Sequence, residues 1–345
     1  MQISLRRTGG LYWNGTSFAS SSEVLLTPTG TTTWSYAFDA FPVDGSYTLR
    51  VVATDTAGNT SSTSTAFTID DTAPSVAVTF PANGATYGNA QFSAGCASPG
   101  VCGTAGDAIS LGGVAISIRH VSTGNYFNGT SFAAATEQQL AVSGTTAWSY
   151  AIAATTFPME GSYVVRATAT DSAGTTTIAT STLTFDRTGP SGADVATTNA
   201  GTAGRPEKND TVSFTFSEAI APGSVLVGWS GAATDVSVRI NDGGAGSDTL
   251  EIWNGENTAR LPMGTIDLGP AAVVTNVVFR GDGANASTMV HSGDRVTVTL
   301  GSVSSGTVGT VGAAASVVWT PSATVTDLYG NACSTTAVTR IFPAF

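Results

Sequence analysis

The sequence predicts an all-β chain of tandem antiparallel Ig-like β-sandwiches, and three observations carry this prediction. Segments of the first 72 residues recur almost unchanged 114 to 116 positions later. Short runs rich in β-branched and aromatic residues alternate apolar with polar side chains, as half-buried strands do. No stretch of about 12 residues has the apolar spacing of an amphipathic helix. The chain is therefore expected to repeat a unit built from short strands.

The repeats also predict where the domains begin and end. YWNGTSF (12–18) recurs as YFNGTSF (126–132), and FPVDGSYTLRVVATDTAG (41–58) recurs as FPMEGSYVVRATATDSAG (157–174). The offset between equivalent residues grows from 114 to 116, so the second repeat has two inserted residues between these segments. A third D-x-x-G turn begins at Asp327. We expect three domains: an N-terminally incomplete sandwich at 1–72, a complete one at 73–188, and a larger one with extended loops at 189–345.

Individual strands follow from a period of two. In SYTLRVVATD (46–55), Tyr47, Leu49, Val51 and Ala53 share one face. The V-D-G-S and M-E-G-S segments before these strands have tight-turn composition. About seven short strands in each repeat of ~115 residues, joined by Gly, Asn and Asp turns, are typical of an antiparallel sandwich. Further runs of this kind are AFTID (66–70), SVAVTF (75–80), AISIRHV (115–121), AWSYAI (147–152) and TVSFTFSEAI (211–220).

These segments carry a resemblance to a known family. YWNGTSF, WSYAF, DGSYTLRVVATDTAGN and DDTAPS, with their second copies, resemble the bacterial immunoglobulin-like repeats of secreted and cell-surface proteins across residues 1–190. KNDTVSFTFSEAIAPGS (208–224) and TDLYGN (326–331) resemble the Ig-like modules of surface-layer and adhesin proteins. The resemblance implies Ig-like sandwiches, an extracellular or cell-surface location, and a structural or adhesive role.

Composition excludes several other classes of protein. Hydrophobic residues make up 41% of the chain, which is enough to bury cores, whereas disordered chains are poor in such residues. The net charge is −11 and Lys208 is the only lysine, so a nucleic-acid partner is not expected. No apolar run approaches the ~18–20 residues of a membrane span. The first ten residues carry no signal-peptide core, although the composition is typical of secreted proteins.

The first unit is expected to be incomplete. Aligning ISLRR (3–7) with ISIRH (116–120) leaves residues 73–115 without a counterpart in the first unit. That segment contains SVAVTF (75–80) and AQFSA (90–94), which we expect to be its first two strands. The first unit would then have an open sheet edge, and such edges pair with other chains. Either the chain is cut from a longer repeat array, or another subunit supplies the missing strand and allows self-association.

Calcium at the first domain junction is implied by the family resemblance. Ca²⁺ takes six to eight oxygen ligands, and clustered carboxylates supply them. The expected ligands at the first junction are Asp55, Asn59, Asp70 and Asp71. In the alternative interpretation, Asp55 and Asp171 only cap their own turns. Otherwise no cofactor is expected to be required.

The second junction departs from this pattern. In the second repeat, Arg187 occupies the position equivalent to Asp71, and Thr175 occupies the position equivalent to Asn59. Asp171 and Asp186 remain there, and Arg187 can pair with either without an ion, so calcium is not expected. A separate segment, GGAGSDTLE (243–251), fits the calcium-binding nonapeptide pattern once, whereas that motif works in tandem copies. We interpret this segment as a glycine-rich hairpin loop.

Cysteines and tryptophans provide the other candidate sites. Cys96 and Cys102 flank a turn-like A-S-P-G-V, which favours a small local disulfide; in the alternative all three cysteines are simply small apolar residues. Trp13, Trp229 and Trp253 are candidates for stacking against a sugar ligand, with packing in the core or at its rim as the alternative.

Catalysis is not expected. His120 and His291 are the only histidines, and neither lies in a motif that pairs a nucleophile with a base. We expect a non-enzymatic extracellular stalk or adhesive segment of a larger bacterial surface or secreted protein, with cell-surface glycans or proteins as partners. Two alternatives remain: a carbohydrate-binding accessory module of a secreted hydrolase, or a subunit of a self-assembling fibre or surface layer that uses strand complementation.

Overall fold

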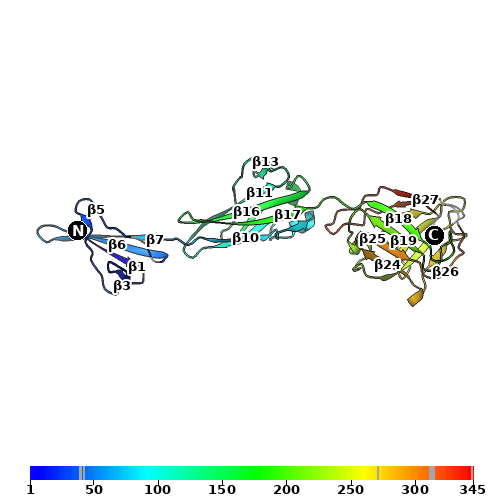
Figure 1. The fold of residues 1–345 in the computed structure, drawn as a ribbon, viewed down its shortest axis with the longest axis horizontal. Helices are drawn as coiled ribbons and strands as arrows, with labels where there is room; N and C mark the ends of the chain where they lie inside the picture. The colour runs from blue at the N-terminus through cyan, green and yellow to red at the C-terminus, as the bar shows by residue number, and fades with distance from the viewer. Residues whose placement is uncertain (39–40, 42, 270–271, 311–314, 343–344) are drawn as a thin grey trace. The chain divides into compact units, whose positions relative to one another are not determined.

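Antiparallel strands are the main regular elements of the structure, a computed structural model that describes residues 1–38, 41, 43–269, 272–310, 315–342 and 345 (Figure 1). The chain divides into two compact units. Residues 1–85 with 92–184 form one unit, and residues 86–91 with 185–345 form the other. No helix among the described residues has the length and apolar character needed to traverse a bilayer.

The first repeat consists mainly of one sheet with the strand order β3-β2-β1-β6-β7. In the β1–β6 pair, Ile3 lies opposite Val51 and Leu5 opposite Leu49, so their apolar side chains share one face. A separate two-stranded sheet, β4–β5, is the other sheet described here. The strands are β1 (Gln2–Arg7), β2 (Tyr12–Trp13), β3 (Phe18–Ser20), β4 (Thr29–Gly30), β5 (Trp34–Ser35), β6 (Gly45–Thr54) and β7 (Thr60–Ile69).

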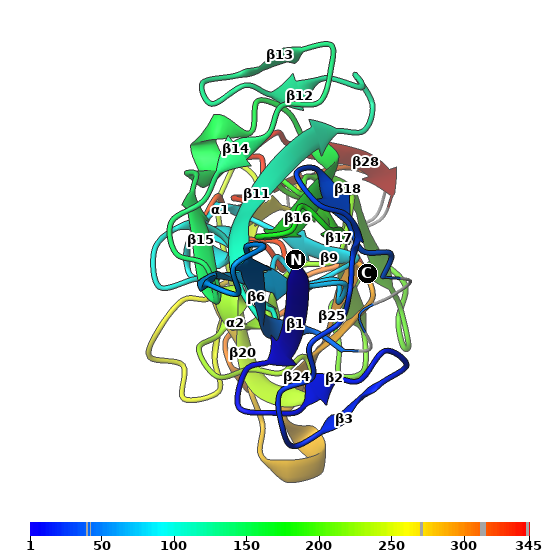
Figure 2. The same ribbon diagram turned by 90° about the vertical axis from the view of Figure 1, so that its left-hand side faces the viewer.

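The second repeat has two sheets. A larger sheet has the order β13-β12-β11-β16-β17-β9, with β14 pairing β11, and a smaller sheet has the order β15-β10-β8. Figure 2 labels the strands of the larger sheet and β15 of the smaller one. Trp148 of the smaller sheet and Tyr163 of the larger sheet are both buried, as expected for a sandwich core. The elements are β8 (Ser75–Phe80), β9 (Ala85–Tyr87), α1 (Asn89–Ser93), β10 (Gly100–Gly106), β11 (Leu111–His120), β12 (Tyr126–Phe127), β13 (Phe132–Ala134), β14 (Leu140–Ala141), β15 (Ala147–Ala151), η1 (Ala154–Thr156), β16 (Gly161–Asp171) and β17 (Thr176–Phe185).

The third segment forms one curled sheet of eleven described strands around a single core. Its two end strands meet, because Arg340 in β28 donates hydrogen bonds to Asp194 (2.6 Å) and to the Ala193 carbonyl (2.9 Å) in β18. Trp319 is fully buried in the core. The elements are β18 (Gly192–Thr198), β19 (Thr211–Phe216), α2 (Pro222–Val225), β20 (Thr234–Asn241), β21 (Thr249–Asn254), β22 (Thr265–Asp267), β23 (Val277–Phe279), η2 (Gly283–Asn285), β24 (Ser287–Ser292), β25 (Arg295–Thr299), β26 (Val303–Ser305), β27 (Ala315–Thr320) and β28 (Val338–Phe342).

The all-β prediction is confirmed, and one expected strand is wrong. SVAVTF is β8, but AQFSA lies in the short helix α1, where Phe92 is fully buried. The strands that follow β8 in this repeat are instead β9, which precedes α1, and β10, G-V-C-G-T-A-G, which pairs with both β8 and β15. The 73–115 segment therefore contains three complete strands, β8, β9 and β10, where two were predicted.

Candidate functional site

Three D-x-x-G turns share one local geometry. In each turn one aspartate oxygen accepts hydrogen bonds from the backbone N–H groups two and four residues later, all at 2.8 Å. The glycine has a positive φ of 87–96°, which favours glycine over residues with a Cβ. The turns begin at Asp55, Asp171 and Asp327 and contain Gly58, Gly174 and Gly330.

The second oxygen of each aspartate distinguishes the three turns. Asn59 donates its side-chain amide to Asp55 Oδ2 at 2.8 Å, and Asn331 donates in the same way to Asp327 Oδ2 at 2.7 Å. Thr175 stands at the corresponding position of the middle turn and has no amide to donate. Asp171 Oδ2 is consequently buried without a hydrogen-bond donor.

Asp171 belongs to a cluster of three carboxylates, which we call the first acidic cluster. Asp70 follows β7, Asp107 follows β10, and Asp171 ends β16, and their ligand atoms lie within 4.8 Å of one another. Both carboxylate oxygens of Asp70, and Oδ2 of Asp107 and of Asp171, are shielded from solvent without a donor. Asp171 as a whole is 3% exposed. Shielded charges of one sign without donors are costly, so a cation or a proton would stabilise this arrangement.

The electrostatics of the first acidic cluster also favour a bound cation or a proton. Burial raises the pKa of the Asp70 carboxyl above its usual value, and the negative charges of Asp107, Asp171 and Asp44 raise the pKa further. A divalent cation with a preference for oxygen ligands would remove that repulsion. Three convergent carboxylates fit Ca²⁺, since each provides one or two of the six to eight oxygens that this ion takes.

The four residues predicted as one calcium site do not converge, which corrects that part of the prediction. Asp55 and Asn59 follow the Thr54–Thr60 pair at one end of the β6–β7 hairpin, whereas Asp70 follows the Gly45–Ile69 pair at the other end. Asp71 is exposed, and its backbone N–H donates to Asp44 at 2.9 Å. The structure instead brings Asp70, in the linker of the first repeat, to the D-x-x-G turn of the second.

A second acidic cluster combines the same kinds of residue: a linker aspartate, a carboxylate beyond a strand and a D-x-x-G turn aspartate. Asp186, the counterpart of Asp70, lies with Glu218 and the turn residue Asp327, with ligand atoms within 4.8 Å. This cluster has its own amide donor, because Asn331 Nδ2 donates to Asp327 at 2.7 Å and to Asp186 Oδ1 at 3.4 Å. The Arg187 guanidinium lies over the Phe185 ring with its Cζ 5.2 Å from the centroid.

Asp107 and Glu218 are the cluster residues that the sequence interpretation missed. Asp107 lies in the segment that has no counterpart in the first repeat, so comparing the repeats gave it no partner position. Glu218 lies two residues beyond β19, in S-E-A-I. A sequence pattern could have identified both residues: each is a carboxylate just beyond the end of a strand, and each cluster also contains a linker Asp and the D-x-x-G turn of the following repeat.

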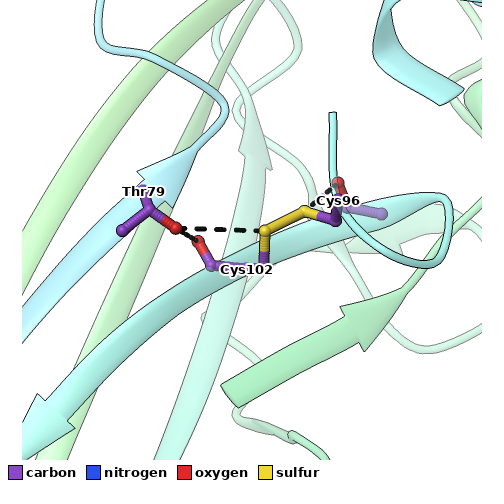
Figure 3. Close-up of a disulfide and its surroundings, with 4 residues drawn as sticks. Thr79, Cys96 and Cys102 are labelled. Atoms are coloured by element: carbon purple, nitrogen blue, oxygen red, sulfur yellow. Dashed lines mark hydrogen bonds between the residues drawn. A yellow bond between two sulfur atoms is a disulfide. The ribbon is translucent and has the colours of Figure 1, made fainter. Parts of the chain in front are cut away.

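A disulfide joins Cys96 and Cys102, whose Cα atoms are 6.2 Å apart (Figure 3). Thr79 in the neighbouring strand β8 donates a hydrogen bond to the Cys102 carbonyl at 3.1 Å. The loop before β10 is therefore held at both ends. Cys333 is a buried free thiol, and burial, together with the charge of Glu218, raises its pKa to about 11.

The three tryptophans predicted as sugar contacts occupy different surroundings. Trp229 is 8% exposed and donates its indole N–H to the Ala232 carbonyl at 2.6 Å, so its ring faces are unavailable to a ligand. Trp253 is covered on one face by Arg239, with the guanidinium carbon 3.5 Å from the ring centroid. Trp13 packs against Phe18 at 5.2 Å between ring centroids.

The remaining motifs have structural roles. The GGAGSDTLE segment is confirmed as a hairpin loop, since it joins the paired strands β20 and β21. Its Asp248 is buried and accepts backbone hydrogen bonds from Gly243 (2.9 Å) and Val273 (2.8 Å). His120 is buried with its ring nitrogens 3.1 Å from the Thr123 and Ser122 hydroxyls, and burial lowers its pKa.

Comparison with known proteins gives a family match for part of the chain. Residues 16–71 match the family described as bacterial Ig-like domain. No curated protein matches the sequence significantly. The match lies within the first repeat, whose segments recur in the second, and the strands of both repeats form antiparallel sheets. The fold of the described residues is therefore all-β with antiparallel sheets, and its first repeat contains the segment that is similar to a bacterial Ig-like domain.

Several solved structures of bacterial adhesins are similar at low identity. A tetra-tandem repeat in the extending region of a large adhesion protein is 16% identical with a TM-score of 0.29, over 99% of this chain and 79% of that one. A 1.5-MDa bacterial ice-binding adhesin is 14% identical with a TM-score of 0.30, over 87% and 85%. A Ca²⁺-stabilised adhesin of an Antarctic bacterium is 14% identical with a TM-score of 0.25, over 99% and 88%.

Proposed function

We propose that this chain is a non-enzymatic segment of an extracellular bacterial surface protein, in which its repeats form a stalk or adhesive region stabilised by Ca²⁺. The first acidic cluster carries this proposal. Its buried carboxylate oxygens lack donors within the protein, and a bound Ca²⁺ would supply the missing positive charge. The proposed partners are glycans or proteins of a cell surface.

The position of the first acidic cluster favours a mechanical role for the ion. Asp70 belongs to the segment between β7 and β8, whereas Asp107 and Asp171 belong to the second repeat. An ion shared by these three residues would tie the linker to the body of the second repeat. Such a tie stabilises the folded chain by mass action, since the unfolded chain does not hold the three carboxylates together.

Thermal unfolding of the whole chain with calcium and with a chelator tests the proposal. Calcium at about 100 times its dissociation constant stabilises a protein by about 2.7 kcal/mol, which raises the melting temperature of a unit this size by about 5–10 °C. The Asp70→Asn variant should lose this increase. The matched control Asp71→Asn changes an exposed neighbour outside the cluster and should retain it.

Equal melting temperatures in calcium and in chelator would contradict the calcium part of the proposal. An equal calcium response in Asp70→Asn and Asp71→Asn would place the ion elsewhere. Magnesium serves as the comparison ion, because it requires a tighter octahedral shell and should shift the transition less than calcium does.

A further inference from the structure

Four of the five arginines in the first compact unit lie on the solvent-facing side of a sheet, two in each repeat. Arg6 and Arg50 belong to the neighbouring strands β1 and β6, and their side chains lie on the face opposite buried Leu5. Arg119 and Arg166 are their counterparts in the second repeat. The unit contains no lysine, and the whole chain has a net charge of −11. A positively charged face is therefore an exception in this protein.

A cavity of about 190 Å³ lies on this face of the first repeat. Its walls are polar and include Arg6, Arg50, Glu23, Tyr12, Thr48 and Ser64. Among the described residues, the side-chain hydroxyls of Tyr12, Thr48 and Ser64 have no hydrogen-bond partner, so they are free to bond a ligand. The cavity is smaller than the pockets of about 300–1,000 Å³ that hold drug-sized molecules, and it suits a ligand of monosaccharide size.

The two arginines of the cavity differ in how much of their charge is already paired. Arg50 Nη1 lies 2.8 Å from Glu23 Oε2, so that pair is neutral. Arg6 lies over the Tyr12 ring, with its Cζ 5.3 Å from the centroid, and its Nε donates to the Gly10 carbonyl at 3.4 Å. Its two terminal amino groups have no partner among the described residues. The guanidinium is thus held in place with a planar pair of donors free, which is the geometry that a carboxylate accepts.

The second repeat shows that this face stays open in a repeat that has both of its sheets. Arg166 and Glu137 form the equivalent pair there, and their side chains are 34% and 31% exposed, against 40% and 32% for the pair of the first repeat. Arg119 likewise lies over the Tyr126 ring, at 5.9 Å. Strands β8 and β10 belong to the smaller sheet, and β9 lies at the far edge of the larger one. These strands therefore do not cover the arginine face.

We infer that the cavity is a subsite for an acidic sugar, a pyranose ring that carries a carboxylate. The free donors of Arg6 pair with the carboxylate, and the hydroxyls of Thr48 and Ser64 bond the hydroxyl groups of the ring. Because Arg50 and Glu23 neutralise each other, Arg6 leaves the cavity with a net positive charge that attracts an anion. This inference rests on the glycan part of the proposed function, names the class of glycan, and does not involve the calcium cluster.

Isothermal titration calorimetry of the intact chain with a galacturonic acid trimer tests the inference. The methyl ester of the trimer is the matched probe, since it has the same rings without the charges. We expect the trimer to bind at least about tenfold more tightly than the ester, because charge-assisted hydrogen bonds are the stronger kind. Sodium sulfate is the third probe and should compete with the trimer only weakly, because it offers no ring hydroxyls.

Arg6→Gln removes the free charge and should weaken trimer binding by about tenfold or more. Arg7→Gln is the matched control, because Arg7 is the next residue of β1, is equally exposed, and lies on the opposite face. Since both arginines are exposed, both variants should melt at the temperature of the wild type. The second repeat has Val164 in place of Thr48, so its equivalent face should remain in Arg6→Gln as a weaker site.

Four results would overturn the inference. These are no binding of the trimer, equal binding of the trimer and its ester, equal affinities of Arg6→Gln and Arg7→Gln, and competition by sulfate as strong as that of the trimer itself. The titrations are repeated in chelator, and binding that requires calcium would also overturn it, since the ion rather than Arg6 would hold the carboxylate. A chain that melts higher in calcium but binds no trimer contradicts this inference alone and leaves the calcium part of the proposed function intact.

Discussion

One side chain decides whether a D-x-x-G turn in this chain satisfies its own aspartate. Asn59 and Asn331 each donate an amide to the second oxygen of the turn aspartate, whereas Thr175 leaves Asp171 Oδ2 buried and without a donor. An unsatisfied buried acceptor costs more than the net gain of an average hydrogen bond. Under the calcium proposal, the middle turn is therefore the one that a bound cation would stabilise most.

Replacing Thr175 with Asn should reduce that dependence. The new amide would donate to Asp171 Oδ2, as Asn331 donates to Asp327, and a hydrogen bond to a charged group contributes about 1.5–3 kcal/mol. We expect the free energy of unfolding in chelator to rise by about 1–2 kcal/mol after the cost of ordering the side chain. Urea unfolding in chelator and in calcium measures both this gain and a smaller calcium response.

The adjacent Thr176→Asn variant is the control, since Thr176 is exposed and lies outside the turn's hydrogen bonds. If Thr175→Asn and Thr176→Asn behave alike in chelator, the unsatisfied oxygen is not the source of instability.

A second residue-scale feature recurs in both repeats. Glu137 accepts a hydrogen bond from buried Ser117 at 2.6 Å and pairs with Arg166 at 2.6 Å. The Ser117 hydrogen bond, and then Arg166, hold the pKa of Glu137 below its usual value. Glu23 forms the same contacts with Ser4 and Arg50 in the first repeat. The sequence interpretation missed both sets, although their repeat offsets could have identified them.

Glu137→Gln should destabilise the second repeat by about 1 kcal/mol at pH 7, a value reduced by solvent screening of a partly exposed pair. Because the folded pKa is lowered, this stabilisation is present above the unfolded pKa of Glu and is lost as the pH falls through the folded value. The wild type should therefore lose more stability than the variant between about pH 5 and pH 3. Urea unfolding across this range measures it, and Glu256→Gln, at an exposed site, should follow the wild type.

At the scale of elements, strands with strong alternation were predictable and strands shaped by packing were not. SVAVTF, with three β-branched residues at alternate or adjacent positions, is strand β8 as expected. β10 was missed because its three glycines and one alanine have low β propensity. Its glycine at 103 is dictated by contact with Trp148, and such a tertiary requirement leaves no local sequence pattern.

Gly103→Ala should therefore destabilise the second repeat. The added Cβ would overlap both the Trp148 ring and the Ala77 carbonyl, so β10 must shift relative to its two neighbours β15 and β8 in the smaller sheet. Overpacking of this kind costs about 1–3 kcal/mol. Gly113→Ala is the matched control, because a Cβ there meets nothing within 4 Å. Equal unfolding midpoints for the two variants in urea would show that β10 does not lie against Trp148.

At the scale of the whole molecule, comparison of the repeats identified equivalent residues, but it did not show which of these residues contact one another. Asp55 and Asp171 are equivalent turn residues, and Asp70 and Asp186 are equivalent linker residues. The prediction paired a turn with the linker of its own repeat, but a strand hairpin ten residues long keeps those two ends apart. The linker aspartate lies instead with the turn of the following repeat, an arrangement that depends on how one domain follows another.

This arrangement predicts how the units of the chain unfold. The compact unit of residues 1–85 and 92–184 contains the whole first acidic cluster, whereas the other unit has its own core around Trp319. Separate cores should give separate calorimetric transitions, because each unit unfolds cooperatively on its own. We expect calcium to raise the transition of the first unit and Asp70→Asn to remove only that increase. A single transition for the entire chain would show that the two units unfold together. A calcium-induced rise of both transitions would show that the ion acts on more than the linker between the repeats.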